Sequence, residues 1–153
     1  MHDFDLRDFF PYRVRVFATA VSAAVTRVYT ERHGLAVSEW RTMAILGSNR
    51  ALSAKEIVEK SSMDKVNVSR AVQSLRKKGL LKRDIDGDDR RRAVLRLTEE
   101  GNRVFQDLVP LVRDVEQQLI SDLSDDELRV LEKLMARVKH KAEETLKMAE
   151  HSG

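Results

Sequence analysis

The side chains with the clearest chemistry in this sequence fall in two neighbouring segments that are rich in polar and basic residues. The first has helical spacing and presents on its outer side the set Lys65, Val66, Asn67, Ser69, Arg70 and Gln73. The second is a short polar stretch that contains Asp89, Arg90, Arg91 and Arg92. Arginine reads guanine through paired hydrogen bonds, asparagine and glutamine read adenine, and serine and lysine more often hold phosphates. Both segments therefore predict contacts to double-stranded DNA, in which Val66 suits a thymine methyl group.

The charge of the chain is distributed unevenly, although the net charge is only +3. Residues 60–83 hold eight basic residues against one acidic residue, whereas residues 114–127 hold six acidic residues and neither lysine nor arginine. This segregation favours binding of a polyanion, such as DNA, at one end of the molecule. A solvated basic helix face explains a charge run of this kind equally well, so the run alone does not decide between the two interpretations.

The composition argues against several other classes of protein. The chain has no cysteine, which excludes disulfides and thiolate zinc sites. The four histidines, His2, His33, His140 and His151, lack metal-ligand spacing, and no nucleophile–base pair points to an enzyme. We therefore expect no cofactor and no metal. The acidic N-terminus and the absence of a long apolar run predict a cytoplasmic protein without a membrane partner.

The elements that position the first segment have strong local signals. Ser53 and Glu56 form a capping box for a short helix over Ala54–Lys60. Asp64 caps a longer helix that ends at Gly79. Its apolar positions have the spacing of one buried helix face, and they are Val68, Ala71, Val72 and Leu75. A short helix, a tight turn and a longer helix together predict a helix-turn-helix.

A β-hairpin is expected directly after this helix. The β-rich runs Leu80–Ile85 and Ala93–Leu97 flank the polar stretch Asp86–Arg92, in which Gly87 among aspartates supplies turn chemistry. A helix followed by a hairpin with a basic tip is the layout of a winged helix-turn-helix. The expected fold is therefore mainly α with a small β-hairpin wing.

Helices are also expected on both sides of this lobe. A first helix spans Phe9–Glu31, and Ser38 is expected to cap a second over Glu39–Leu46. Thr98 and Ser124 cap two later helices, the last of which runs to about Met148. We expect one domain over residues 1–153, with a winged helix-turn-helix lobe at about 38–98 and dimerisation helices at about 9–32 and 98–148. The apolar stripes of the terminal helices predict a twofold homodimer; packing of these helices on each other within one chain is the alternative.

Nearly the whole chain resembles the MarR family of transcription regulators. The matching residues are Leu35, Glu39-Trp40-Arg41, Asp64-Lys65, Val68-Ser69-Arg70-Ala71-Val72, Leu75, Lys78-Gly79-Leu80, Asp89-Arg90-Arg91 and Leu95-Arg96-Leu97-Thr98-Glu99-Glu100-Gly101. The resemblance implies that Arg91 enters the minor groove and that Asp89 braces the wing by pairing with a nearby arginine. Arg90 and Arg92 are expected to reach phosphates or solvent. The chain departs from the family where Gly87 replaces a frequent proline and Arg92 a frequent serine.

The resemblance also implies a small effector. Seven of the eight aromatic residues lie within residues 1–40. A cleft lined by Tyr12, Arg15, His33 and Trp40 would suit an anionic aromatic compound, whereas the competing interpretation places these aromatics in the dimer core. The expected function is a homodimeric repressor that an effector releases from a pseudo-palindromic operator. The alternative is a constitutive or architectural winged-helix DNA-binding protein without an effector.

Overall fold

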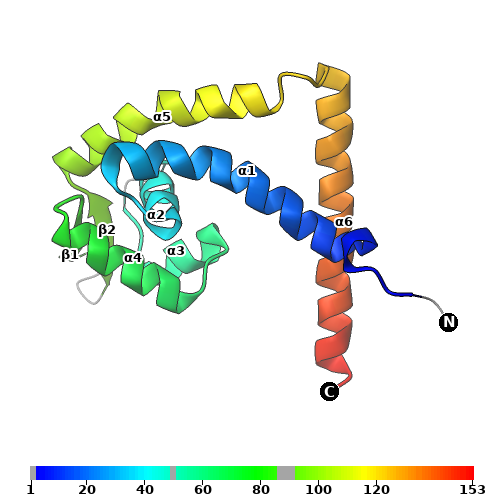
Figure 1. Ribbon diagram of the computed structural model, residues 1–153. Helices are drawn as coiled ribbons and strands as arrows, with labels where there is room; N and C mark the ends of the chain where they lie inside the picture. The colour runs from blue at the N-terminus through cyan, green and yellow to red at the C-terminus, as the bar shows by residue number, and fades with distance from the viewer. Residues whose placement is uncertain (1–2, 49–50, 86–91) are drawn as a thin grey trace. The chain divides into compact units, whose positions relative to one another are not determined.

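The computed structural model describes residues 3–48, 51–85 and 92–153, and it confirms the expected fold class (Figure 1). The elements in chain order are η1 (Leu6–Asp8), α1 (Phe10–His33), α2 (Val37–Ser48), α3 (Ala54–Ser61), α4 (Lys65–Lys77), β1 (Leu81–Ile85), β2 (Ala93–Leu97), α5 (Glu99–Leu119) and α6 (Asp125–His151). The chain divides into two compact units, residues 1–115 and residues 116–153. Each unit is described by itself.

The predicted caps of the helix-turn-helix are present. The backbone N–H of Glu56 donates to Ser53 Oγ at 3.2 Å, and the backbone N–H of Ser53 donates back to Glu56 Oε1 at 3.3 Å. At the start of α4, the backbone N–H of Asn67 donates to Asp64 Oδ1 at 2.7 Å. Such caps satisfy backbone donors that a helix leaves unpaired in its first turn. They therefore fix where α3 and α4 begin.

The turn after α4 leads directly into the hairpin. Gly79 adopts a φ of 74°, a left-handed conformation that glycine tolerates without steric cost. The backbone N–H of Leu80 then donates to Leu75 O at 2.9 Å. β1 pairs antiparallel with β2, with Leu81 opposite Leu97. The strands agree with the prediction except that β1 begins at Leu81.

The hairpin is also joined to the segment before α3, which the sequence did not predict. Leu52 and Leu95 form an isolated antiparallel bridge, with backbone N–H to O distances of 3.2 and 2.7 Å. This bridge adds a third extended segment beside β2. The tip of the wing, residues 86–91, lies outside the described residues.

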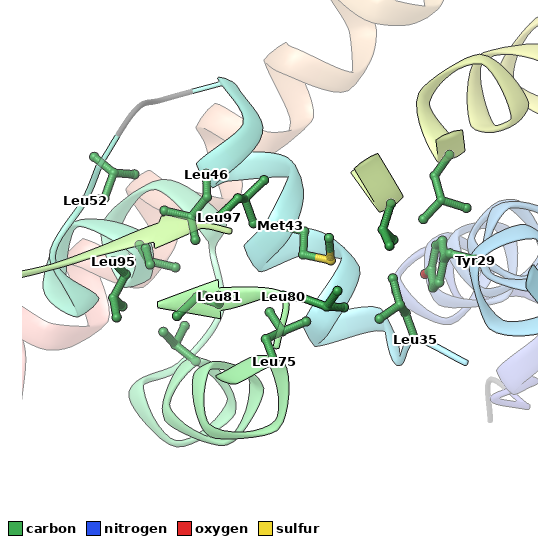
Figure 2. Packing of buried hydrophobic residues seen from close by; sticks show 14 residues of the cluster. Tyr29, Leu35, Met43, Leu46, Leu52, Leu75, Leu80, Leu81, Leu95 and Leu97 are labelled. Carbon is green, nitrogen blue, oxygen red and sulfur yellow. The ribbon is translucent and has the colours of Figure 1, made fainter. Parts of the chain in front are cut away.

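The core of the first unit lies between α4, α2 and the hairpin (Figure 2). Leu75 from α4, Met43 from α2 and Leu81 from β1 are all buried in it. Val68 and Ala71 are buried on the same side of α4, as the helical spacing predicted. Because this side of α4 packs in the core, the opposite side of the helix faces outward.

Helix α5 packs closely on the same core. Thr98 Oγ1 accepts from the backbone N–H of Gly101 at 3.0 Å and so caps the helix, as predicted. Gly101 lies against the carbonyl group of Leu80, where a Cβ atom would overlap with the backbone oxygen. Further along α5, Val104 and Leu108 share the core with Tyr29 of α1. The end of α1 is thereby packed against the first half of α5.

The predicted cap of α2 is wrong. This helix begins at Val37, so Ser38 lies inside its first turn, and the carbonyl oxygen of Ser38 accepts from Thr42 Oγ1 at 2.8 Å. The carboxylate of Glu39 instead accepts from the backbone N–H of Ala36 at 3.0 Å. The first turn of α2 is therefore closed by the Glu39 side chain, which satisfies the backbone N–H of Ala36 directly before the helix.

The second unit contains the end of α5 and the long helix α6. Ser124 and Glu127 form the predicted capping box at the start of α6. No residue of α6 is buried, although its apolar stripe includes Leu131, Leu134 and Val138. In the described residues, no helix is long and apolar enough to span a membrane.

Candidate nucleic-acid interface

The outward face of α4 gathers all six residues that the sequence predicted for base and phosphate contacts. Lys65, Val66, Asn67, Ser69, Arg70 and Gln73 are all exposed. Val66 has 59% of its surface exposed, so its side chain is accessible to a thymine methyl group. A single helix with a polar outer face fits the dimensions of the DNA major groove.

Asn67 is held in place by the cap of the same helix. Its side-chain Nδ2 donates to Asp64 Oδ2 at 2.8 Å. This contact orients the amide at the first turn of α4, where base edges are commonly read by a recognition helix. Because the carboxamide carries two N–H donors and one acceptor oxygen, the contact with Asp64 does not use up its capacity to pair with adenine.

A groove of about 540 Å³ lies beside α4 and is walled by α3 and the hairpin. Lys65, Ser69 and Gln73 line it from α4. Three further cationic residues lie around it, and they are Lys55, Arg76 and Arg83. No carboxylate belongs to the described lining, so the groove has a positive potential that suits a phosphate backbone.

Sequence reasoning did not include these three cations among the site residues. Arg76 follows Gln73 by three positions and Ser69 by seven, so helical spacing was the signal that placed it on this face. Lys55 and Arg83 lie on other elements. Only the packing of α3 and the hairpin against α4 brings them to the groove.

The base of the wing is tied to α3. Arg92, the first described residue after the wing tip, forms an ion pair with Glu56, the same residue that closes the α3 capping box. Further down the hairpin, Arg96 and Asp84 pair at 3.5 Å. The predicted phosphate contact of Arg92 therefore competes with a contact inside the protein. The predicted roles of Asp89, Arg90 and Arg91 fall outside the described residues.

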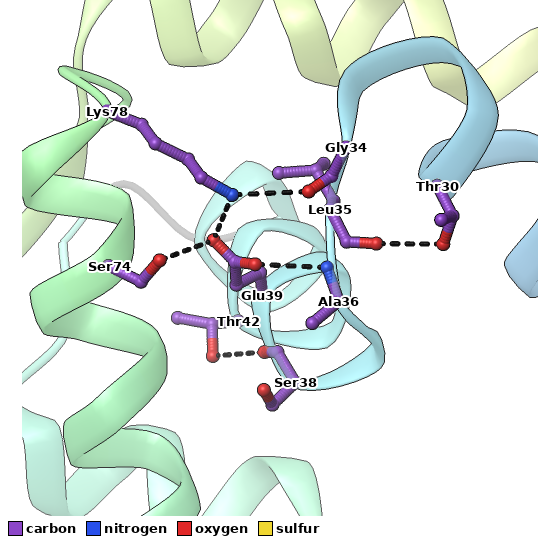
Figure 3. Close-up of polar contacts among 9 residues, drawn as sticks. All are labelled: Thr30, Gly34, Leu35, Ala36, Ser38, Glu39, Thr42, Ser74 and Lys78. Carbon is purple, nitrogen blue, oxygen red and sulfur yellow. Dashed lines mark hydrogen bonds and ion pairs between the residues drawn. The ribbon is translucent and has the colours of Figure 1, made fainter.

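The C-terminal end of α4 is fixed to α2 by a buried polar network (Figure 3). Glu39 Oε2 accepts from Lys78 Nζ at 2.8 Å and from Ser74 Oγ at 3.0 Å. Burial alone would raise the pKa of Glu39, but the hydrogen bonds from Lys78, Ala36 and Ser74 outweigh it, so the pKa is lowered. Glu39 is therefore ionised at neutral pH, although only 6% of its surface is exposed.

A second polar cluster joins α1 to α5. Asp107 accepts from Arg32 Nε at 2.6 Å and pairs with His33 Nε2 at 2.8 Å. The hydrogen bonds from Arg32 and His33 hold the pKa of Asp107 well below its usual range. His33, a predicted effector residue, is thus engaged at the end of α1.

The four predicted effector residues have different surroundings in the described part of the chain. The Trp40 ring stacks on Tyr29 with ring centroids 5.4 Å apart, and Tyr12 is half-buried on α1. Arg15 alone of the four lines an open groove along α1, of about 930 Å³. The described residues contain no group of three or more His, Asp or Glu side chains that would hold a metal ion.

The arrangement of α3, α4 and the hairpin, with a basic groove beside the outer face of α4, defines a winged helix-turn-helix DNA-binding protein. Residues 33–92 match the model of the MarR family. The chain is also 30% identical, over 88 residues or 58% of its length, to YwaE, an uncharacterised HTH-type transcriptional regulator of Bacillus subtilis. The match spans about half, 52%, of that relative's length.

Solved structures agree with this fold along most of the chain. The PcaV transcriptional regulator from Streptomyces coelicolor, determined in complex with its natural ligand, is 25% identical with a TM-score of 0.76, over 93% of this chain and 99% of that one. The S. aureus MepR–DNA complex gives 20% identity and a TM-score of 0.79, over 87% and 98% of the two chains. Together these findings confirm the predicted resemblance to the MarR family of transcriptional regulators, whose model matches residues 33–92.

Proposed function

We propose that this protein is a homodimeric, effector-responsive repressor that binds a pseudo-palindromic DNA operator. The observation that carries the proposal is the outer face of α4, which presents six exposed residues suited to DNA beside a groove lined by cations. Base-reading side chains on the helix supply sequence preference, and the cations around the groove supply affinity for the backbone.

In this proposal, α4 is the recognition helix. Arg70 and Gln73 are the residues best suited to base edges, because a guanidinium pairs with guanine and a carboxamide with adenine. Lys65 and Ser69, which line the groove, hold the phosphates. Arg91, at the wing tip, is proposed to enter the minor groove, where A·T-rich sequence concentrates negative potential.

The homodimer is supported by two apolar surfaces that the single chain leaves exposed. Phe10 of α1 has 55% of its surface exposed, and Phe17 has 54%. On α6, Leu134 is 47% exposed and Met135 is 54% exposed. Several large apolar side chains exposed on one helix mark an interaction site. A twofold partner covers it, and its symmetry places two recognition helices on two half-sites.

The open groove along α1 is the candidate effector site. Arg15, Arg27 and Arg41 supply three cations to it, and one carboxylate, Glu31, pairs with Arg27 at 2.9 Å. An excess of positive charge on a partly apolar wall suits a small carboxylate or phenolate. The PcaV relative was determined with its natural ligand bound, which supports a ligand role for this fold.

Release of DNA requires that the effector favour one arrangement of the dimer over another. An effector that binds better to a dimer with the wrong spacing of its two α4 helices lowers the population that fits the operator. The alternative is a constitutive or architectural DNA-binding protein, for which the same basic groove serves every sequence equally.

Footprinting on the DNA that adjoins the protein's own gene tests the proposal. A discrete, two-part protected region at physiological salt is the expected result, whereas uniform coating supports the architectural alternative. A thermal-shift screen of aromatic acids, phenols and acyl thioesters then searches for the effector, because a ligand of the folded state raises its melting temperature. Loss of the shift in an Arg15→Ala variant is expected for a ligand in the α1 groove.

A further inference from the structure

Glu39 is the one buried carboxylate among the residues that the structure describes, and the proposed DNA contacts make no use of it. Both of its oxygens are engaged. Oε1 accepts from the backbone N–H of Ala36, while Oε2 accepts from Ser74 Oγ and Lys78 Nζ (Figure 3). Ser74 lies in the last turn of α4 and Lys78 is its C-cap. The start of α2 is therefore bonded to the end of the recognition helix.

The same ammonium group reaches the end of α1. Lys78 Nζ also donates to the carbonyl oxygen of Gly34 at 3.3 Å. Directly before Gly34, Arg32 and His33 hold Asp107 of α5. Hydrogen bonds on either side of the His33–Gly34 peptide link thus connect α5 and the end of α1, through Lys78, to Glu39 and the recognition helix.

A buried ion pair adds little net stability, because desolvation of the two charges offsets their attraction. The pair instead fixes the orientation of α4. The apolar contacts of Val68, Ala71 and Leu75 fix which side of α4 faces the core, but apolar attraction itself has no preferred direction. Ser74 and Lys78 are four residues apart and lie on one face of α4 and its C-cap. Because hydrogen bonds are directional, the bonds from these two residues to Glu39 specify both the rotation of α4 and its position along its axis.

We propose that Glu39 is a positioning residue for DNA reading, which sets the orientation of α4 and couples it to the end of α1. The inference rests on the proposed DNA-binding function. Glu39 touches no DNA in this account, since it is buried between α2 and α4. It acts by aligning side chains such as Arg70 and Gln73 with base edges, whereas the groove cations bind the backbone in either case.

The substitution Glu39→Gln tests this with little change in shape. The amide oxygen of glutamine still accepts from Ala36, and the amide nitrogen can donate to Ser74 Oγ, which reverses that bond. The amide nitrogen cannot accept from Lys78, so Lys78 keeps only the carbonyl oxygen of Gly34. The readout is the ratio of the dissociation constants for a scrambled duplex and for the operator found by footprinting or selection. We expect this ratio to fall about tenfold, the effect of one lost hydrogen bond to a charged group. Affinity for the scrambled duplex stays unchanged.

Two further variants complete the experiment. Glu59→Gln, at an exposed position of α3, is the matched control and is expected to keep the wild-type ratio. Lys78→Met removes the ammonium from a partly exposed position and is expected to lower the ratio as Glu39→Gln does. Lys78→Arg restores a donor and is expected to rescue it. If Glu39→Gln fails to fold, the two Lys78 variants decide the question.

The outcomes separate the two proposals. A wild-type protein without preference for any duplex sequence overturns the proposed function. A wild-type protein that discriminates, together with Glu39→Gln and Lys78→Met variants that discriminate equally well, overturns the positioning role alone. Equal losses on both duplexes also contradict it, because they indicate general destabilisation rather than a misaligned helix.

Discussion

Arg70 is the residue on which sequence reading is expected to depend most directly. It lies on the exposed face of α4, next to Ser69 and three positions before Gln73. A guanidinium that reads guanine contributes through paired hydrogen bonds that a wrong base cannot form. Its loss therefore weakens binding to the operator more than binding to other sequences.

We predict that Arg70→Ala raises the dissociation constant for the operator by the equivalent of about 1–3 kcal/mol. Fluorescence anisotropy at fixed salt measures the change. The control is Arg103→Ala, which removes an exposed arginine of α5 that pairs with Glu100. Equal affinities for the Arg70 and Arg103 variants would remove Arg70 from the set of base-reading residues.

Asp107 provides a prediction on pH at the same scale. Its pKa is lowered in the folded protein by hydrogen bonds from Arg32 and His33, so it stabilises the fold above its ordinary pKa of 3.8 and less as the pH falls below that value. Asp107→Asn should lower the free energy of unfolding at pH 7, with a difference from wild type that shrinks below about pH 4. Denaturant titrations at several pH values measure it. A difference that does not change with pH contradicts the prediction.

At the scale of the elements, local signals predicted most of the DNA-binding lobe. The caps at Ser53 and Asp64, and the cap at Ser124 of α6, were predicted correctly. Each of these caps depends on neighbours within three residues, and such neighbours are visible in the sequence. The cap at Ser38 was predicted wrongly. Instead, the Glu39 carboxylate accepts from the backbone N–H of Ala36 and also from Lys78 Nζ. The contact with Lys78 joins residues far apart in the sequence, so only the folded chain creates it.

The candidate site shows the same division between local and long-range features. The outer face of α4 could be predicted, because burial of Val68, Ala71 and Leu75 fixes which residues point away from the core. The contribution of Lys55 and Arg83 to the groove could not, because three separate elements form its walls. The pairing of Leu52 with Leu95 was missed for a similar reason.

The junction of α5 with the hairpin gives a stability prediction. Alanine normally improves a helix by about 1 kcal/mol over glycine, but at Gly101 its Cβ would overlap with the backbone oxygen of Leu80. Because a backbone oxygen cannot rotate away, we expect Gly101→Ala to lower the free energy of unfolding by about 1–3 kcal/mol.

The matched control for this variant is Gly47→Ala in α2. There the added Cβ would meet the ring of Phe105, and a side chain can shift where a backbone cannot. Urea denaturation of both variants gives the comparison. A Gly101→Ala protein as stable as wild type contradicts the close approach of α5 to Leu80.

At the scale of the whole molecule, reading a two-part operator requires two chains. Within its own unit, α6 leaves its apolar residues uncovered, since no residue of that helix is buried. Single apolar residues on a surface are common, whereas an apolar stripe along a long helix marks an interaction site.

We predict that Leu134→Glu shifts the protein toward a monomer, because a charge in an apolar interface is left without a partner. Sedimentation velocity should give twice the chain mass of 17.6 kDa for wild type and a lower average mass for the variant. Lys133→Glu, at an exposed neighbouring position of the same helix, is expected to remain dimeric. A wild-type monomer at micromolar concentration contradicts the dimer.

The most direct measurement of the central claim is selection of binding sites from a pool of random duplexes at physiological salt. We predict an enriched inverted repeat whose half-sites lie about one DNA turn apart. We also predict at least about 10³-fold tighter binding to this repeat than to a scrambled duplex. Recovery of unenriched sequences, bound with the same affinity as any other duplex, would contradict the claim that α4 reads an operator.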